Sequence, residues 1–579
     1  MARGQEDYLP RRRLAFVRLA FFVFFLIIAW RLFQLQVLSA GHYQRLAQGQ
    51  HDLYSQLVPE RGEVFIQDPL SPTKLAPAAV NRQRYLVFAV PNDVTDPSAT
   101  ARTLGPVLGV EPITLGSALG KAGDPYEPLQ HAVSEEMRAR VDALSLAGIH
   151  TTPELIRTYP EGDRLGQVLG FVGFVGDRRI GQYGIEGGWE TELAGIQGAL
   201  RSERDAVGGL ITLGERDLIE AQDGVDLVLT IDKNIQFRAC TALAAAVARH
   251  GAASGSIVIV EPASGAVRAL CNAPSFDSNA YGAVKQVSDF SNLAVSAPYE
   301  PGSVMKAITM AAALEARAVT PDTTYVDTGE IRIGPDVMKN SDGKSHGRQT
   351  MTQVLEESLN TGAIFAMRSA GVKAFKDMVS AFGFGENTGL ELPHEQAGSL
   401  ATLGEKQEIY AATASFGQGI TATPLQLVTA FAAIANRGRL MKPYLVQEVR
   451  QSDGRVQVTE PTLVRQVIAP QVASTLSAML VSVVERGHGK RAGVPGYYVG
   501  GKTGTAQVSY QDRSGYDPDK NIGTFIGFAP ADNPRFAMVV KIVEPRGVVF
   551  AESSAAPVFG EVARYLLEYY QVPPSRPIK

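Results

Sequence analysis

A serine and a lysine three residues apart could do nucleophilic chemistry in the segment Glu300-Pro301-Gly302-Ser303-Val304-Met305-Lys306. A serine hydroxyl needs a neighbouring base, and a lysine can serve if burial or a nearby cation lowers its pKa. Pro301-Gly302 cannot lie inside a helix, and residues 307–318 are rich in Ala, Ile, Met and Leu, so Ser303 is predicted in the first turn of a helix. Positions three apart share a helix face, which places the Lys306 amine beside the Ser303 hydroxyl. The alternative is an N-cap serine with a solvated lysine.

Two motifs downstream could complete such a site: Ser358-Leu359-Asn360 and Gly500-Gly501-Lys502-Thr503-Gly504-Thr505. Lys502 and Thr503, in a strand, could offer a cation and a hydroxyl to a substrate carboxylate, and the glycines let backbones approach closely. Asn360 could hydrogen-bond a substrate amide, and Ser358 could relay a proton to a leaving amine. A turn and an exposed strand end are the alternative.

The elements around these motifs predict an α+β domain. A strand at 226–232 leads into a helix at 233–250 with Asp232 as its N-cap, and 255–261 with 266–272 read as a β-hairpin. Two helices are expected about Asn360 within 351–370. Strands return at 497–500, running into the Lys502 motif, and at 524–528 and 536–543, before a helix at 556–570. The pattern predicts a sheet built from both ends of the domain with a helical insert between them, and Ser303 at the junction.

Composition places the chain among globular proteins of two or more domains. It has 579 residues, 45% of them hydrophobic, and a net charge of -4. With no basic patch interleaved with aromatics, a nucleic-acid binder is not expected. The sequence shows no His/Cys/Asp cluster with metal-ligand spacing, so neither a metal nor a cofactor is predicted. Cys240 and Cys271 could pair in an oxidising compartment, and two buried thiols are equally compatible with the sequence.

The amino terminus predicts one membrane helix, assigned to residues 14–38. Its centre from Leu19 to Trp30 has no charge, and Arg18 and Arg31 flank it. Because basic residues precede it, residues 1–13 are expected in the cytoplasm and the bulk of the chain outside. A cleaved signal peptide is the competing reading, but no small-x-small site follows the apolar run. Residues 39–222, beginning with a helical continuation at 39–50, are predicted to form a mixed, non-catalytic pedestal for dimerisation or docking, and 223–579 the catalytic domain.

The three motifs in this order resemble the signature of penicillin-binding proteins and serine β-lactamases. The chain as a whole resembles a class B penicillin-binding protein, a peptidoglycan D,D-transpeptidase. Further blocks that look like this family are Arg61-Gly62-Glu63-Val64, Gly184-Ile185-Glu186, Leu229-Thr230-Ile231-Asp232 and the run from Ser415 to Gln426. The resemblance therefore covers nearly all of the chain. The region at 61–222 is short for the glycosyltransferase of class A members.

The resemblance implies a mechanism for the motif residues. Ser303 would attack the penultimate D-Ala carbonyl of a stem peptide, release the terminal D-Ala and pass the acyl group to the amine of a neighbouring stem peptide. Lys306 would be the base, and Ser358 and Asn360 would serve as proton relay and amide contact. The terminal carboxylate would be held by Lys502, Thr503, Gly504 and Thr505, and the oxyanion by the backbone amides of Ser303 and Thr505. β-Lactams, which mimic the D-Ala-D-Ala end, would acylate Ser303.

Within class B, Asn360 and the Ser415 block look more like the division-specific, FtsI-like branch than the elongation branch. This would imply septal wall synthesis, with a SEDS-family glycosyltransferase and divisome membrane proteins as partners, in the bacterial cytoplasmic membrane. A serine β-lactamase is disfavoured because no Glu-Pro-x-x-Asn pattern occurs. An elongation-type enzyme, or a membrane-anchored scaffold or sensor with an idle site, is the alternative.

Overall fold

The computed structural model describes residues 9–34, 52–176, 178–203, 216–510 and 515–577. The chain divides into two compact units: Met1–Glu60 with Gly195–Asp223, and Arg61–Ala194 with Gly224–Lys579. The helix expected at 39–50 lies outside the described residues, as do residues 35–38 of the predicted membrane segment.

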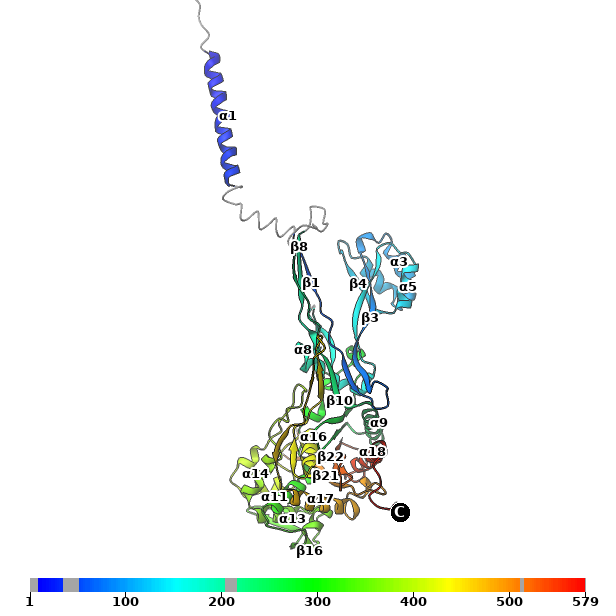
Figure 1. Ribbon diagram of the computed structural model, residues 1–579, viewed down its shortest axis with the longest axis vertical. Coiled ribbons are helices and arrows are strands. Elements are labelled where there is room, and N and C mark those ends of the chain that lie inside the picture. Colours follow the sequence, from blue (N-terminus) through cyan, green and yellow to red (C-terminus); the bar gives the residue numbers. More distant parts are fainter. Residues whose placement is uncertain (1–8, 35–51, 177, 204–215, 511–514, 578–579) are drawn as a thin grey trace, which may run out of the picture. The chain divides into compact units, whose positions relative to one another are not determined.

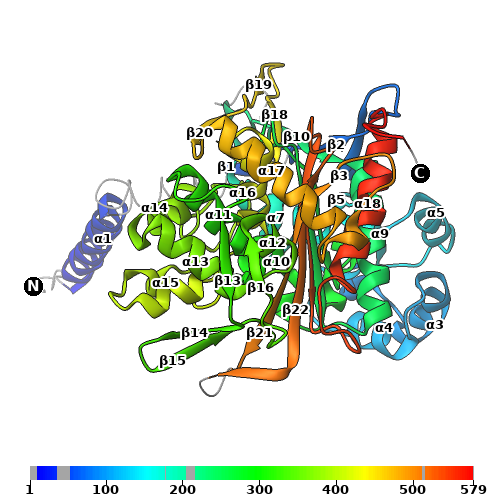
Figure 2. The same cartoon turned by 90° about the horizontal axis from the view of Figure 1, so that it is seen from below.

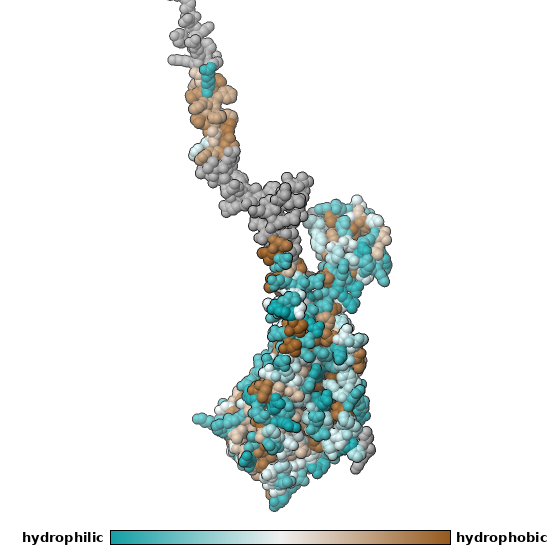
Figure 3. Space-filling model, viewed as in Figure 1, coloured by the Kyte–Doolittle hydropathy of each residue, from teal (hydrophilic) through white to brown (hydrophobic). Residues whose placement is uncertain are grey.

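The first unit contains an apolar helix and a three-stranded sheet. Helix α1 (Leu9–Phe33) begins before the predicted residue 14, because arginines are good helix formers and residues 11–13 extend it. Within it, Ala15–Phe33 is long and apolar enough to cross a membrane, and apolar side chains cover its surface (Figure 3). The antiparallel sheet has the order β1-β8-β9, formed by β1 (Asp52–Leu57), β8 (Gly198–Glu203) and β9 (Arg216–Ile219).

The second unit contains a mixed sheet that takes strands from distant parts of the sequence. Its order is β19-β18-β10-β2-β3-β4, with β5 pairing β3. The strands are β2 (Val64–Gln67), β3 (Leu75–Ala89), β4 (Glu127–Val133), β5 (Ile149–Thr158), β10 (Asp226–Asp232), β18 (Val446–Arg450) and β19 (Val456–Val458). Strand β10 pairs parallel with β2 and antiparallel with β18. The sheet thus crosses the predicted domain division at 222, which stays a prediction.

Short helices pack against the long strands β3, β4 and β5 and bury an apolar cluster there. They are α3 (Pro97–Leu108), α4 (Pro112–Leu119) and α5 (Glu135–Ala143). Helix α3 begins at Asp96, whose side chain accepts from the backbone of Ala99, and α5 begins in the same way at Ser134. A small hairpin, β6 (Phe171–Val175) with β7 (Arg178–Gln182), and the helices α6 (Gly166–Leu169), α7 (Gly184–Gly188) and α8 (Glu190–Ala194) follow.

A five-stranded antiparallel sheet forms the centre of the catalytic region (Figures 1 and 2). Its order is β12-β11-β23-β22-β21. The strands are β11 (Ser254–Val260), β12 (Val267–Ala273), β21 (Gly500–Ser509), β22 (Tyr516–Ala529) and β23 (Phe536–Val543). Strand β21 starts later than expected and contains the Lys502 motif, because a turn with Gly496 at a φ of 87° precedes it. The predicted sheet of hairpin and late strands is confirmed.

Helices cover both faces of this sheet (Figure 2). Helices α9 (Lys233–His250) and α18 (Ala555–Tyr569) pack on one face, and α16 (Pro424–Ala435) on the other. Asp232 caps α9 as predicted, by accepting from Asn234 and Ile235. Cys240 of α9 and Cys271 of β12 form a disulfide, which resolves the pairing that the sequence left open.

The insert between β12 and β21 is mainly helical. Beside α16 it contains α10 (Leu293–Ser296), α11 (Met305–Glu315), α12 (Met351–Glu356), α13 (Asn360–Ala370), α14 (Val372–Ala381), α15 (Glu408–Ser415) and α17 (Pro470–Glu485). The hairpin β14 (Glu330–Ile333) with β15 (Asp336–Lys339) and the pairs β13 (Thr324–Asp327) with β16 (Gly347–Thr350) and β17 (Arg439–Met441) with β20 (Leu463–Gln466) complete it. The two helices expected about Asn360 are α12 and α13.

Candidate active site

Ser303 lies on a single 3₁₀ turn, Gly302–Val304, that continues directly into α11. The turn requires glycine at 302, where φ is 58°, a conformation that L side chains rarely adopt. Ser303 is partly exposed, whereas its neighbours Gly302 and Val304 are buried. The predicted position at the start of a helix is therefore observed, and the hydroxyl is open to a substrate.

Lys306, the second residue of α11 and one turn after Ser303, is buried with only 1% of its surface exposed. Its amine donates to the backbone carbonyl of Ser358 and, over 3.2 Å, to the Ser358 hydroxyl. Burial, together with the nearby Lys502 charge, holds the pKa of Lys306 well below its ordinary value. The sequence argument required a lysine of lowered pKa, and the structure supplies one.

Lys502 reaches the same hydroxyl from β21. Its amine is fully buried and donates to the Ser358 hydroxyl over 3.0 Å and to the Thr503 carbonyl over 3.1 Å. Burial lowers the pKa of Lys502 to about 7. Ser358 sits between α12 and α13 with a φ of 58°, a strained conformation for a non-glycine residue of the kind that recurs at functional sites. Two buried amines thus converge on one serine hydroxyl.

The Ser303 hydroxyl makes no hydrogen bond within the described part of the chain, whereas the sequence placed the Lys306 amine beside it. The Lys306 amine donates to Ser358, which offers two acceptors to a buried amine. In unliganded enzymes the bond between nucleophile and base is often long and tightens only when substrate binds.

Strand β21 lies directly against the Ser303 turn. A methyl group at Gly504 would lie 2.9 Å from the Pro301 carbonyl oxygen, and one at Gly302 would lie 2.9 Å from the Thr505 carbonyl oxygen. Only glycine permits this approach at either position. The backbones of Ser303 and Thr505 are therefore neighbours, as an oxyanion hole shared by the two would require.

The predicted substrate contacts have partners of their own in this structure. The Thr503 hydroxyl accepts from Lys502 over 3.3 Å, and the Thr505 hydroxyl accepts from the Ala551 backbone over 3.2 Å. Asn360 begins α13, and its Nδ2 donates to the carbonyl of Lys339 on β15 over 2.8 Å. The Asn360 amide is thus fixed by the β14–β15 hairpin, and its oxygen is the atom left to meet a substrate.

Glu300 is a site residue to which the sequence assigned no role. Its carboxylate accepts from the Gly419 backbone over 2.9 Å and from the Tyr516 hydroxyl over 3.0 Å, and burial raises its pKa. Gly417 packs so closely that a methyl group there would lie 2.1 Å from the Gly302 carbonyl oxygen. The glycines of the Ser415 block, recognised in the sequence only as a family pattern, therefore support the nucleophile turn.

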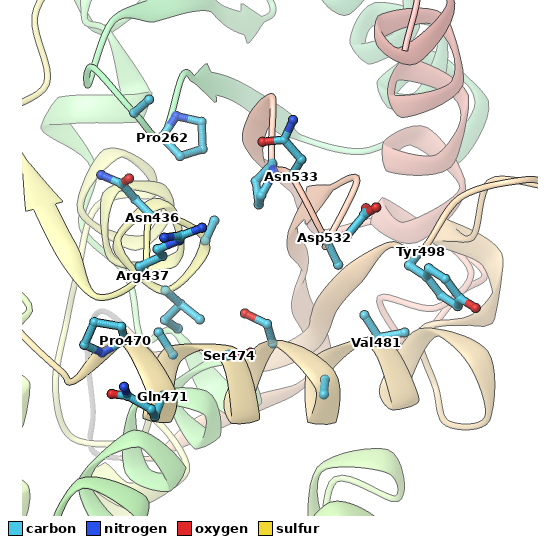
Figure 4. Close-up of a pocket in the computed structure, with 18 residues that line it drawn as sticks. Pro262, Asn436, Arg437, Pro470, Gln471, Ser474, Val481, Tyr498, Asp532 and Asn533 are labelled. Carbon is cyan, nitrogen blue, oxygen red and sulfur yellow. The ribbon is translucent and has the colours of Figure 1, made fainter. Parts of the chain in front are cut away.

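A cavity of about 730 Å³ lies elsewhere, and none of these site residues lines it. Pro470, Gln471 and Ser474 of α17 form one wall, opposite Asn436 and Arg437 just beyond α16 (Figure 4). We assign the chemistry to the Ser303 region, because the buried amines and the exposed hydroxyl meet there.

A nucleophilic serine at the start of a helix, a buried lysine one turn later and a Lys-Thr-Gly strand on an antiparallel sheet define a penicillin-recognising serine acyltransferase. Comparisons with known proteins agree. The profile described as "Penicillin binding protein transpeptidase domain" matches residues 255–564, and that described as "Penicillin-binding Protein dimerisation domain" matches residues 58–229.

Similar proteins span almost the full chain. Stage V sporulation protein D of Bacillus subtilis is 32% identical over 572 residues, covering 98% of this chain and 87% of that protein. The peptidoglycan D,D-transpeptidase FtsI homolog of Mesostigma viride is 27% identical over 98% of this chain and 97% of its own. The crystal structure of penicillin-binding protein 3 of Mycobacterium tuberculosis with aztreonam has a TM-score of 0.69 at 26% identity, covering 90% of this chain and 99% of that one.

The chain belongs to the class B penicillin-binding proteins. The predicted family, the α+β fold class and the transpeptidase class of enzyme are confirmed.

Proposed function

We propose that this protein is a peptidoglycan D,D-transpeptidase that works through an acyl-enzyme on Ser303. One observation carries the proposal: the buried amines of Lys306 and Lys502 both donate to the Ser358 hydroxyl, while the β21 backbone lies against the Ser303 turn. This arrangement supplies a base, a proton path and an oxyanion site around one exposed hydroxyl.

Acylation begins with proton transfer from Ser303 to Lys306. Burial lowers the pKa of Lys306, which favours the neutral amine as the base that takes the proton as Ser303 Oγ bonds to the penultimate D-Ala carbonyl carbon. The backbone amides of Ser303 and Thr505 receive the oxyanion. Lys502, Thr503 and the Thr505 hydroxyl hold the terminal carboxylate, and a bound carboxylate raises the pKa of Lys502 and keeps it charged.

The intermediate collapses by breaking the bond between carbonyl carbon and amide nitrogen. The proton held by Lys306 passes through the Ser358 hydroxyl, which lies 3.2 Å from Nζ, to the departing D-Ala amine. The Asn360 side-chain oxygen accepts from the stem-peptide amide and holds the donor chain in place. An acceptor amine then attacks the Ser303 ester carbonyl, and the bond between that carbon and Ser303 Oγ breaks. The acceptor's proton travels the path in reverse, through Ser358 and Lys306 to Ser303 Oγ, which restores the hydroxyl and leaves a new peptide cross-link.

β-Lactams are the expected inhibitors of this site. Aztreonam is bound in the similar Mycobacterium tuberculosis structure, and the opened lactam would occupy Ser303 as an ester. Deacylation is expected to be slow, because the sequence has no Glu-Pro-x-x-Asn pattern, which in class A β-lactamases supplies the glutamate that positions the water.

We assign the protein to the bacterial cytoplasmic membrane, anchored by α1 with its amino terminus inside. The arginines at 11–13 and at 18 precede the apolar core of α1, which is the orientation that the positive-inside rule favours. The residues after α1, including the pedestal predicted at 39–222 and the catalytic region from 223, would then lie outside. A SEDS-family glycosyltransferase and divisome membrane proteins are the proposed partners.

A septal role is preferred over side-wall elongation. It is supported by Asn360 and the Ser415 block, and by the FtsI homolog among the similar proteins. Depletion of the protein should then produce filaments with unfinished septa, whereas rounded cells would favour the elongation role.

The proposal is tested by labelling the membrane-bound, full-length protein with a fluorescent penicillin and chasing with unlabelled drug. We expect a stable labelled band in the wild type and in Ser369→Ala, a matched change at an exposed helical serine. Ser303→Ala should give no band, because the hydroxyl that forms the ester is gone. Undiminished labelling of Ser303→Ala would contradict the proposal, and rapid loss of label during the chase would favour a hydrolase. Incorporation of a D-amino acid probe into stem peptide separates a transpeptidase from a carboxypeptidase.

A further inference from the structure

A row of mostly polar residues crosses the five-stranded sheet on the face that packs against α16. The backbone register makes them successive cross-strand neighbours, one on each strand: Asn272, Ser256, Lys541, Thr524 and Gly504. The four side chains are buried, although the residues two positions away on the same face, such as Val258 and Val539, are apolar core. A polar row in an apolar layer requires partners.

The partners come from the segment that leads into the nucleophile turn. This segment, residues 292–301, meets the row step by step. Asn272 donates to the Asn292 side chain over 2.9 Å, the Lys541 amine to the Ala297 carbonyl over 3.5 Å, and the Tyr299 and Thr524 hydroxyls are 2.9 Å apart. The Pro301 carbonyl lies against Gly504. The row therefore fixes the chain that ends at Ser303.

Lys541 is the unusual member of the row. Only 5% of its surface is exposed, and its amine lies 4.0 Å from the centroid of the Tyr299 ring. The groups that face it are neutral: Ser256 on β11, Thr524 on β22, the Ala297 carbonyl and the Tyr299 ring, with the apolar side chains of α16 beyond. No carboxylate of the described residues forms an ion pair with it.

Stability does not account for this lysine. A buried cation without a counter-ion is unfavourable, and the cation–π contact with the ring offsets only part of that. Burial lowers the pKa of Lys541 to about 8, so the amine is mostly protonated at neutral pH. An apolar residue of the same length would be the more stabilising choice.

We propose that Lys541 is a positioning residue for acylation: it holds Tyr299 and Ala297 so that Ser303 stays aligned with Gly504 and Thr505. The inference rests on the proposed role of Ser303. Tyr299 stands four residues before the nucleophile, and its backbone exchanges two hydrogen bonds with Ala422, of 3.0 and 2.9 Å. The contact with Lys541 holds the Tyr299 ring, while the two hydrogen bonds hold its backbone. Because only three residues separate Tyr299 from Ser303, the position of Tyr299 limits where Ser303 can lie.

The test compares Lys541→Met with the wild type in the full-length protein. The rate constant of acylation by a fluorescent penicillin should fall about tenfold, equivalent to about 1.4 kcal/mol of barrier, with the dissociation constant of the non-covalent complex unchanged. The midpoint of thermal unfolding should be unchanged or higher, because an unpaired buried charge is removed. Lys373→Met, the same change at a lysine with 88% of its side chain exposed, is the matched control and should acylate like the wild type. A lower unfolding midpoint together with slower acylation would assign Lys541 a structural role and overturn the proposal.

Two changes at Tyr299 test the ring contact independently, even if Lys541→Met fails to fold. Tyr299→Phe keeps the ring and should acylate within about threefold of the wild type, whereas Tyr299→Leu should match Lys541→Met, because a cation–π contact needs the aromatic face. An equal loss of acylation rate in Tyr299→Phe and Tyr299→Leu would overturn the proposal. In the double variant Lys541→Met/Tyr299→Leu, acylation should be no slower than in the slower single variant, and multiplied losses would show independent action.

Failure of this inference is distinguishable from failure of the proposed function. Lys541→Met should reach full labelling at long times, since only the rate is altered. Ser303→Ala should never label.

Discussion

Two clusters of buried ionisable side chains in the second unit differ in whether each charged group has a partner of opposite charge. In the first, the Glu186 carboxylate is fully buried between Arg61, 2.6 Å away, and Arg157, also 2.6 Å away, and the Tyr159 hydroxyl adds a contact of 3.3 Å. In the second, the amines of Lys306 and Lys502 are buried together around the neutral Ser358 hydroxyl. The first cluster pairs opposite charges, and the second brings two amines together without a carboxylate partner.

The difference distinguishes an ion cluster that stabilises the fold from a pair of amines that we propose to act in the reaction. A paired buried ion keeps its ordinary charge state, and the guanidinium of Arg61 has a raised pKa beside Glu186 and Glu190, although burial alone would lower it. The two lysines have lowered pKa values because nothing compensates their burial. Unpaired buried amines destabilise the fold and are therefore expected where a reaction needs a base at neutral pH.

The largest effect is expected for Lys306→Met. Acylation by penicillin should slow by about a thousandfold, because general base catalysis by the amine is lost. The free energy of unfolding at pH 7 should not fall, since the folded state already disfavours the charged amine. Acylation rates and urea unfolding of the same preparation measure both.

If Lys306→Met lowered the free energy of unfolding as well as the acylation rate, the view that the unpaired amine destabilises the fold would be wrong. Arg317→Met, at an exposed residue just beyond the end of the same helix, is the control and should change neither quantity.

Glu186→Gln should break the paired cluster. It leaves Arg157 buried without a counter-ion and Arg61 with Glu190 alone, and the free energy of unfolding should fall by about 3 kcal/mol. The folded fraction should still label with penicillin, because the cluster touches none of the Ser303 residues.

Asp377→Asn provides the matched control for an ion pair. Its partner Lys373 has 88% of its side chain exposed, so the loss should be below about 1 kcal/mol. If Glu186→Gln lowered the free energy of unfolding by an equally small amount, the buried cluster would have no structural role.

The last effect is a pH dependence of stability, which changes gradually with pH. The folded pKa of Lys502 is about 7 and the ordinary value is 10.5, so between these values the unfolded chain binds a proton that the folded chain does not. The free energy of unfolding should therefore rise with pH through this range, by at most about 1.4 kcal/mol per pH unit for one lysine. Lys502→Met should reduce the slope, as measured by urea unfolding between pH 7 and 9.5. A slope identical to that of the wild type would contradict the burial of an unpaired amine at this position.

Local elements of this fold were predictable because their causes are local. Asp232 caps α9, Pro301-Gly302 precedes the Ser303 turn, and the hairpin predicted from 255–261 and 266–272 is observed within one residue of those bounds. The membrane helix follows from an apolar run. The three motifs, with their order, were enough to predict the family and the residues to be tested.

Contacts between distant residues were not predictable in the same way. The sequence did not indicate that the Lys306 amine bonds Ser358, which the turn between α12 and α13 brings within reach. It left open whether Cys240 pairs with Cys271, and it did not indicate that β10 pairs with strands on both sides of the predicted boundary.

The amino-acid sequence by itself determined the family and predicted which residues carry the chemistry, because reactive groups and helix signals are properties of short segments. Only the tertiary structure decided how those groups affect one another. The register of five strands places Lys541 under Tyr299, and the packing of β21 on the Ser303 turn buries Lys502 beside Lys306. Lowered pKa values arise from this burial, which residues far apart in the sequence create together.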